Sequence, residues 1–441
     1  MFKKLILFFS IIIANISYAE DQFRIIGDAE TENYLKSLVT PLVKAAKLNA
    51  DNVVIRIVAD SELNAFVAGG MNIFINTGLI IKFADDPNVL YGVIAHELAH
   101  IYAGHLTKTR GKYEDMSKVA MAGTILGVAA VLAGSPAGIV LGAGSAQAAQ
   151  RNILQYSRAN ETEADKIAVD LLYKTHNNGS GLIKFFQYVS QRDREFRPDP
   201  YSITHPLSNE RISSVKNAIK EKLGKFGDNI TPQMKFELKR IAVKLEAFLT
   251  KPTDVINKYK NNNYGLSIGY FRSGKLQEAD SLLQKVINDE PNNPYLWELR
   301  GQYYLENGKF AKANDFYQHA LKLLPNDNII KLELATTQFN SAKQSNDRSV
   351  MNTTVKLLDQ ILAKENDNLT AYFLLSRTYG LLGNNQKAIL ALAEFYFYQG
   401  SYFKSKILAT KILKLAPVDS KDYIRAQDII EISKNKEYAK D

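Results

Sequence analysis

The residues best placed to do chemistry are His96, Glu97 and His100, a His-Glu-x-x-His motif within the apolar run 89–106. On an α-helix, residues four apart lie about 40° apart around the axis, so both imidazoles project from one face. Two neutral imidazoles at that spacing bind Zn²⁺, and the glutamate between them can act as a general base. The chain has only six histidines in 441 residues. The motif therefore predicts a site for one zinc ion per chain.

A zinc ion that activates water needs a third protein ligand and an open position. The metzincin pattern places glycine and histidine three and six residues after the second histidine. This chain has Ala103 and Leu106 there, which excludes that pattern. His105 lies about 140° from His100 around a continuous helix. It is interpreted as a surface residue or as support for a ligand.

The better candidate for the third ligand lies downstream, in the segment 157–165. Glu161 and Asp165 are four residues apart and share a helical face, so one can reach the metal while the other supports the ligands. Glu163 points elsewhere on such a helix and is expected to face solvent.

A mixed scaffold is predicted to position these side chains. Helical periodicity covers residues 31–48, a β-branched run covers 53–59, and a strand–turn–strand pattern covers 64–76, with Gly78 closing its second strand. The histidine helix begins at Asp85-Asp86-Pro87, with an acidic cap and a proline in the first turn. It is expected to run to about Arg110, where Gly111 stops it. The fold class is α+β, mainly helical with a small β-sheet.

At this point the chain resembles the gluzincin metalloproteases of the HExxH…ExxxD type, which include the HtpX-like and CAAX prenyl proteases. Further matches are Asn64-Ala65-Phe66, the Gly69-Gly70 turn, and Thr204-His205-Pro206-Leu207 followed by Glu210-Arg211.

The resemblance implies a role for each matching residue. It makes His96, His100 and Glu161 the zinc ligands, Glu97 the catalytic glutamate and Asp165 a supporting residue. It makes His205 a gate or fourth ligand at the open position of the metal. Arg211 is left open between orienting a loop, stabilising an oxyanion and forming an ordinary ion pair, and it is not counted as catalytic.

The N-terminal residues resemble a secretory signal peptide. Lys3 and Lys4 precede an apolar run at 5–16, and Ser17-Tyr18-Ala19 provides small residues before the expected cut. Twelve apolar residues are too few for a comfortable membrane span, which needs about 20, although an uncleaved anchor is the alternative. Residues 1–19 are therefore assigned to a cleavable signal, which predicts a periplasmic protein.

Composition narrows the chemistry further. The chain contains no cysteine, which excludes disulfides, a thiolate zinc site and lipid attachment through an N-terminal cysteine. The net charge is +9, but the lysines are dispersed over predicted helices. This pattern indicates a solvated surface rather than a nucleic-acid groove, and no nucleic-acid partner is expected. Anionic membrane surfaces or acidic partners stay open.

The segment 119–149 consists mostly of Gly, Ala, Val, Leu and Ile, interrupted by Ser135-Pro136. Each half has about 15 residues, which is short for a span. A helical hairpin packed over the protease core is the preferred interpretation. Partial insertion into a membrane surface, giving peripheral contact through 119–149, and a transmembrane hairpin are the alternatives.

The C-terminal part of the chain is repetitive. A spacing of 34 residues aligns Tyr270 with Tyr304 and Pro291 with Pro325, and it pairs small residues between them. The copy containing Trp297 resembles the tetratricopeptide (TPR) pattern, which stacks helix pairs into a solenoid with a concave binding face. The segment 340–352 looks like an insertion. The predicted domains are a metallopeptidase at 20–255 and a TPR solenoid at 256–435.

Together these features predict an exported zinc endopeptidase with a TPR module that binds clients. Unfolded or misassembled polypeptides are the expected substrates, extended along a sheet edge near 68–74. The resemblance to exported TPR-bearing members implies quality control or assembly of outer-membrane proteins and contact with their assembly machinery. The alternative is a periplasmic chaperone or assembly scaffold with a largely latent protease domain.

Overall fold

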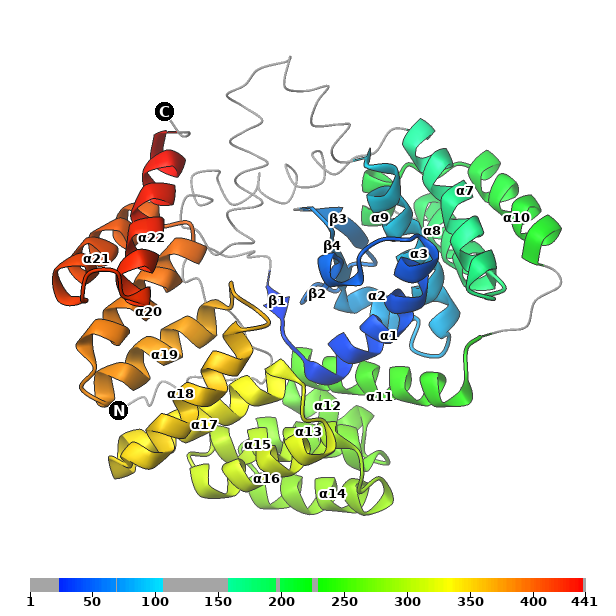
Figure 1. Ribbon diagram of the computed structural model, residues 1–441. Coiled ribbons are helices and arrows are strands. Elements are labelled where there is room, and N and C mark those ends of the chain that lie inside the picture. Colours follow the sequence, from blue (N-terminus) through cyan, green and yellow to red (C-terminus); the bar gives the residue numbers. More distant parts are fainter. Residues whose placement is uncertain (1–23, 69, 106–157, 196–198, 224–228, 439–441) are drawn as a thin grey trace. The chain divides into compact units, whose positions relative to one another are not determined.

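A computed structural model describes residues 24–68, 70–105, 158–195, 199–223 and 229–438 (Figure 1). These residues form two compact units that divide after Lys275, and each is described by itself. The predicted signal peptide at 1–19 and the apolar segment 119–149 lie outside the described residues. Of the helices that are described, none has both the length and the apolar character needed to span a bilayer.

The first unit contains a four-stranded sheet in the order β1-β2-β4-β3. Its strands are β1 (Ile25–Ile26), β2 (Val54–Val58), β3 (Ala65–Ala68) and β4 (Asn72–Asn76). The two central strands β2 and β4 run parallel, while β1 and β3 pair antiparallel at the two sides. The cross-strand neighbours Phe66 and Phe74 stack with ring centroids 5.0 Å apart. The α+β fold class is confirmed.

The sheet order corrects the predicted substrate edge at 68–74. Strand β4 lies between β2 and β3, so its backbone is hydrogen-bonded on both sides. Within the described residues, β3 pairs with β4 alone and is the edge strand. Gly78 also differs from expectation, because it lies inside helix α2 (Thr77–Lys82). A Cβ atom there would collide with the carbonyl oxygen of Ser61, so close backbone contact explains this glycine.

Helix α3 (Pro87–Ala103) carries the histidine motif and is buried from Pro87 through His100. It is mostly apolar and buried on all sides, which is typical of a helix enclosed by other elements. Asp86 stands at the N-cap position as predicted, but its carboxylate accepts from Lys184 at 2.7 Å instead of capping the helix.

The predicted extension of this helix to Arg110 is wrong. Gly104 adopts a left-handed conformation with φ 65°, and its N–H reaches the carbonyls of His100 and Ile101. Glycine adopts this conformation without the penalty that a Cβ imposes, so it ends the helix seven residues before Gly111.

Four further helices contribute to the surroundings of the motif, directly or through one another. Helices α7 (Arg158–Lys174) and α8 (Ser180–Glu195) pack directly against it. The short helix α9 (Pro200–Thr204) leads into the turn that carries His205, and α10 (Asn209–Leu223) packs on α7. These elements bring side chains from three separate parts of the chain onto one face of α3.

A buried ion network joins α1 (Ala29–Ala45) to α11 (Pro232–Leu249). Asp28 caps α1 by accepting from the Thr31 N–H at 2.8 Å, and its other oxygen lies 2.5 Å from Lys244 Nζ. Glu30 accepts from Arg240 Nε at 2.6 Å. These four charged residues, Asp28, Glu30, Arg240 and Lys244, are called the α1–α11 network below.

Short elements complete the first unit. A 3₁₀ turn spans Ala50–Asn52 before β2. Helix α12 (Pro252–Lys258) and helix α13 (Asn263–Arg272) pack with α11. Helix α13 thus lies beyond the predicted division between residues 255 and 256 and still belongs to the first compact unit.

The second unit consists of helices that pack on their sequence neighbours, as the TPR pattern predicts. They are α14 (Leu276–Asp289), α15 (Pro294–Glu306), α16 (Phe310–Leu323), α17 (Asn328–Ser345), α18 (Arg348–Leu362), α19 (Leu369–Leu381), α20 (Asn385–Tyr398), α21 (Tyr402–Leu415) and α22 (Lys421–Tyr438). The segment 340–352 lies where α17 extends to 18 residues, against 13 in α15, and turns at Asn346 into α18.

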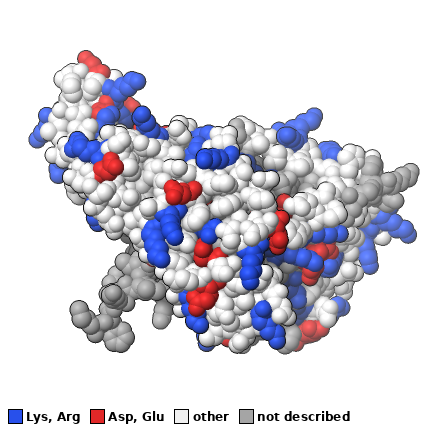
Figure 2. Space-filling view, turned by 90° about the horizontal axis from the view of Figure 1, so that it is seen from below, with Lys and Arg blue, Asp and Glu red and all other residues white. Residues whose placement is uncertain are grey.

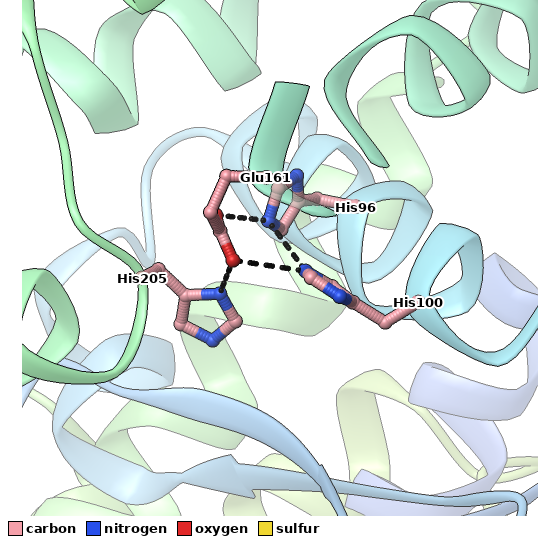
Figure 3. Close-up of side chains that lie close together, drawn as sticks. All are labelled: His96, His100, Glu161 and His205. Carbon is pink, nitrogen blue, oxygen red and sulfur yellow. Dashed lines mark hydrogen bonds and ion pairs between the residues drawn. The ribbon is translucent and has the colours of Figure 1, made fainter. Parts of the chain in front are cut away.

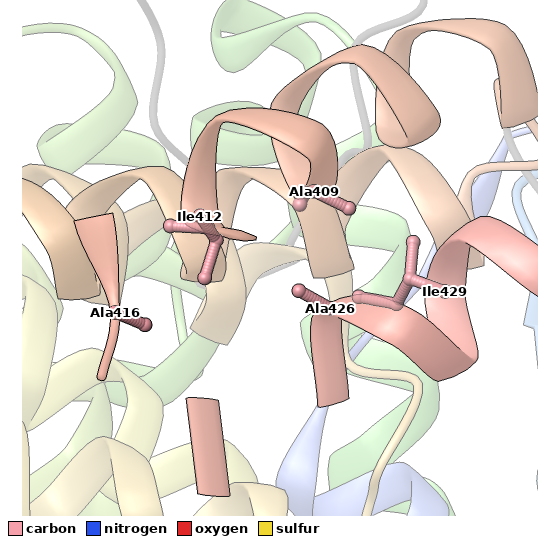
Figure 4. Packing of buried hydrophobic residues seen from close by; sticks show 6 residues of the cluster. Ala409, Ile412, Ala416, Ala426 and Ile429 are labelled. Atoms are coloured by element: carbon pink, nitrogen blue, oxygen red, sulfur yellow. The ribbon is translucent and has the colours of Figure 1, made fainter. Parts of the chain in front are cut away.

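Small side chains let the helices of this unit approach closely. Ala409 and Ala426 are fully buried between α21 and α22, beside Ile412 and Ile429 (Figure 4). Such packing is what the alanines of the repeat pattern predict. On the face shown in Figure 2, basic and acidic side chains are interspersed and most of the surface is uncharged.

Candidate metal centre

The two motif histidines of α3 point their Nε2 atoms at each other, 3.1 Å apart (Figure 3). Glu161, in the first turn of α7, directs its carboxylate between them. Its Oε2 lies 3.3 Å from His96 Nε2, and its Oε1 lies 3.4 Å from His100 Nε2. All three side chains are fully or almost fully buried.

These distances fit a tetrahedral metal ion. Zinc lies about 2.0–2.1 Å from imidazole nitrogen and carboxylate oxygen, so tetrahedral ligand atoms are separated by roughly 3.3 Å. The three separations between His96, His100 and Glu161 bracket that value. Two imidazoles and one carboxylate are also a donor set that catalytic zinc sites use.

His205 completes the cluster from the turn after α9. Its Nδ1 lies 3.0 Å from Glu161 Oε1, and one ligand atom from each of the four residues falls within 4.8 Å of the others. The Tyr201 ring stacks on the imidazole at 4.4 Å with 17° between the planes, which fixes its orientation. His205 is therefore the fourth member of a group of side chains that could hold a metal ion.

Glu97 lies beside the cluster and is completely buried. Neither of its carboxylate oxygens has a hydrogen-bond partner among the described residues, and His205 Nε2 lies 3.5 Å from its Oε1. Burial raises the pKa of Glu97 to about 7. A buried carboxylate with both oxygens available, next to a cluster of metal-binding atoms, is suited to exchange a proton with a water molecule or a substrate.

Asp165 supports the cluster from one turn further along α7. Its Oδ1 lies 3.1 Å from His96 Nδ1, so the Nε2 of that histidine is left to face the cluster. Burial alone raises the pKa of Asp165, but its hydrogen bonds with His96 and Arg211 outweigh this effect and lower it. Burial likewise lowers the pKa of His96, yet Asp165 and Glu161 raise it to about 10. The surroundings of His96 thus stabilise positive charge.

Arg211 on α10 ties the cluster to the turn that carries His205. Its guanidinium donates two hydrogen bonds to Asp165, at 2.7 and 2.9 Å, and one to the carbonyl of Pro206 at 2.7 Å. It also lies 2.9 Å from Glu161 Oε2. These contacts fit both an ion pair and the orienting of a loop, because they join the ligands to the turn.

His105 differs from the expectation based on a continuous helix. Because α3 ends at Ala103, the chain turns and places His105 Nδ1 2.9 Å from His100 Nδ1. The imidazole is 1% exposed, and its Nε2 lies 3.2 Å from Glu163 Oε2. Glu163 is half exposed, as its predicted solvent-facing position requires, yet it contacts a residue that touches the cluster.

Comparisons with known proteins agree with this geometry. A model of peptidase family M48 matches residues 29–219, and a tetratricopeptide repeat model matches residues 294–327. The metalloprotease YcaL of Escherichia coli (strain K12) is 30% identical over 185 residues, which cover 40% of this chain and 68% of that protein. The chain belongs to peptidase family M48.

Two longer relatives match this chain over most of its length. A beta-barrel assembly-enhancing protease of Yersinia pestis is 23% identical over 333 residues, covering 70% of this chain and 66% of that protein. The protein of the same name in Escherichia coli (strain K12) is 20% identical over 385 residues, covering 85% of this chain and 77% of that protein. The resemblance to HExxH metallopeptidases with TPR repeats is confirmed.

The structure brings together every residue that the sequence singled out, since Glu97 and Asp165 lie in contact with the four-residue cluster. The sequence did not assign Arg211, Tyr201 or the contact between His105 and His100. For Arg211 the available signal was its place after the Thr-His-Pro-Leu motif. For His105 it was Gly104, a residue that commonly ends helices.

Proposed function

We propose that this chain is an exported, zinc-dependent endopeptidase whose TPR repeats bind polypeptide clients. The observation that carries the proposal is the convergence of His96, His100 and Glu161 at tetrahedral separations, with the available carboxylate of Glu97 beside them. The donor set of two imidazoles and one carboxylate favours zinc among divalent ions. Membership of the M48 family supports peptide bonds as the target.

A zinc ion in this site would supply Lewis-acid polarisation of a peptide carbonyl and acidify water. Glu97 removes the proton from the attacking water at one carboxylate oxygen and delivers it to the leaving amine. Its raised pKa suits both halves of that transfer near neutral pH. Arg211 and Asp165 hold the ligands in place without contacting the substrate.

The peptide substrate is proposed to lie extended along β3, the edge strand that packs against α3. Backbone hydrogen bonds to a strand edge tolerate varied side chains. This mode of binding suits unfolded or misassembled chains and predicts a loose sequence preference.

The Glu97→Gln variant of the full chain tests this function. The amide cannot act as a base, so casein cleavage should fall by about 10²–10⁴-fold while the zinc content stays at the wild-type level. Glu195→Gln is the matched control, because Glu195 is an exposed carboxylate at the end of α8. Substantial cleavage by a metal-loaded Glu97→Gln protein would refute the assigned role.

His205 is proposed to gate the site. Its imidazole belongs to the four-residue cluster, and Arg211 and Tyr201 contact its turn, which supports a role at the position that water would occupy. Displacing this turn would open the fourth position. The His205→Ala variant should therefore cleave casein faster than wild type does in the absence of a client. Unchanged or slower cleavage would contradict gating.

The relatives named beta-barrel assembly-enhancing proteases support a role in the assembly or quality control of outer-membrane proteins. We place the chain in the periplasm, on the strength of the signal-like residues 1–19, and assign client binding to the TPR unit. An assembly machinery for outer-membrane proteins is the proposed partner.

A second candidate is a periplasmic chaperone or assembly scaffold whose protease is largely latent. The position of His205 in the cluster favours this candidate, because a filled fourth position leaves the protein able to bind clients without cleaving them. Equal client protection by wild type and Glu97→Gln, with no cleavage by His205→Ala, would support it over the peptidase.

A further inference from the structure

The Nδ1 atoms of the two motif histidines meet different surroundings. His96 Nδ1 faces the buried carboxylate of Asp165 directly at 3.1 Å. His100 Nδ1 faces a second imidazole, that of His105, at 2.9 Å. A half-exposed carboxylate, Glu163 Oε2, stands 3.2 Å beyond that imidazole.

The chain of contacts from Glu163 to His100 has one consistent direction. An ionised carboxylate only accepts hydrogen bonds, so the Nε2 of His105 carries the proton and donates to Glu163. In the neutral form of the ring, Nδ1 of His105 then has a lone pair and accepts from the Nδ1–H of His100. The remaining nitrogen of His100, Nε2, is left with a lone pair directed at Glu161 and His96.

The backbone makes this contact possible. Gly104 turns the chain with φ 65° directly after the last residue of α3, and the next residue folds back onto the preceding turn. His105 is 1% exposed, so its imidazole is enclosed and cannot exchange His100 for a water partner at low cost.

We propose that His105 and Glu163 are positioning residues that fix the tautomer and ring orientation of His100 for metal binding. They do for His100, through an intervening imidazole, what Asp165 does for His96 directly. Partners of this kind raise metal affinity because the ligand no longer has to be ordered when the ion binds. The proposal rests on the metal site of the proposed function and extends it to two residues outside the motifs.

The test measures the zinc affinity of the full-length chain by competition with a chelator. His105→Leu removes the acceptor for His100 and should weaken zinc binding by about 10–100-fold. His105→Asn keeps an oxygen near the position of Nδ1, and zinc affinity should recover to within about threefold of wild type. Glu163→Gln should produce a smaller loss than His105→Leu.

Cobalt substitution adds a readout that separates positioning from packing. The d–d absorption of bound Co²⁺ depends on ligand orientation, so His105→Leu should alter the spectrum while His105→Asn preserves it. Glu195→Gln is the control for the charge change at Glu163, and His176→Asn controls for losing an imidazole elsewhere in the first unit; both should match wild type.

The results distinguish failure of the positioning role from failure of the proposed function. If wild type binds zinc and the His105→Leu variant binds it equally tightly, the positioning role is overturned but the proposed function is not. Equal losses in His105→Leu and His105→Asn also overturn it, because packing would then explain both. A wild-type chain that binds no metal overturns the proposed function together with this extension of it.

Discussion

The first unit contains two buried groups of ionisable side chains, the α1–α11 network and the metal centre, which differ in how their charges are paired. In the α1–α11 network each acid has a basic partner: Asp28 pairs with Lys244, and Glu30 pairs with Arg240. Two carboxylates and two cations leave no net charge. None of their polar side-chain atoms lacks a hydrogen-bond partner within the described residues.

The metal centre is not balanced in this way. Three carboxylates, those of Glu97, Glu161 and Asp165, face one guanidinium, that of Arg211. When the imidazoles are neutral and all three carboxylates are ionised, the state that metal binding requires of the ligands, two negative charges are in excess. A divalent cation would balance that charge. Both oxygens of Glu97 are without a hydrogen-bond partner among the described residues.

The contrast shows which property marks a functional site. Burial and shifted pKa values occur in both groups. Burial opposes ionisation of Asp28 and Glu161, yet Lys244 lowers the pKa of Asp28 and His205 holds that of Glu161 well below its usual value. Of the two groups, only the metal centre combines a buried carboxylate without a hydrogen-bond partner in the described part of the chain, that of Glu97, with imidazole and carboxylate atoms that lie within 4.8 Å of one another. That combination, rather than burial, indicates a ligand.

The Lys244→Met substitution should have the largest effect that distinguishes the α1–α11 network from the metal centre, a loss of folding stability. The substitution keeps the length of a side chain that is 2% exposed but leaves Asp28 without its cation. Breaking a buried pair on one side costs about 3–5 kcal/mol of folding free energy. Urea unfolding, followed by hydrogen exchange in α1 and α11, measures this loss.

The metal centre should be unaffected by that change. Zinc affinity of the folded Lys244→Met protein should equal that of wild type, because the network has no contact with the ligands among the interactions described above. A parallel loss of zinc affinity would show that the two groups are not independent. Adding Asp28→Asn to Lys244→Met should recover part of the stability, since the uncompensated charge is then removed.

Lowering the pH should have a smaller effect on the stability that the α1–α11 network provides. The lowered pKa of Asp28 means that its ionised form stabilises the folded chain above its ordinary value of 3.8, and that this contribution is lost as pH falls through the folded pKa. The stability difference between wild type and Asp28→Asn should therefore be constant near neutrality and shrink below about pH 4. An identical difference at pH 7 and pH 3 would rule out an ionised pair.

The sequence predicted what short-range spacing determines. His96 and His100, like Glu161 and Asp165, are four residues apart on helices, so their shared faces follow from helix geometry. The same spacing made segment 157–165 the candidate for the third ligand. The choice of Glu161 over Asp165 as that ligand came from the resemblance.

What the sequence missed depends on tertiary contacts. Arg211 reaches Asp165 across 46 positions, and Arg240 reaches Glu30 across 210. The contact of His105 was missed for a local reason, since the helix was extended past Gly104 and the angle around a continuous helix no longer applied. Treating that glycine as a helix end would have placed His105 near its neighbour.

The most direct test of the account is a calorimetric titration of the metal-free, full-length chain with Zn²⁺. The account predicts one ion bound per chain in wild type and in Glu97→Gln, and loss of that binding when His96 and Glu161 are both replaced by alanine. A wild-type chain that takes up no zinc, or a double variant that binds it as tightly as wild type, would contradict the account.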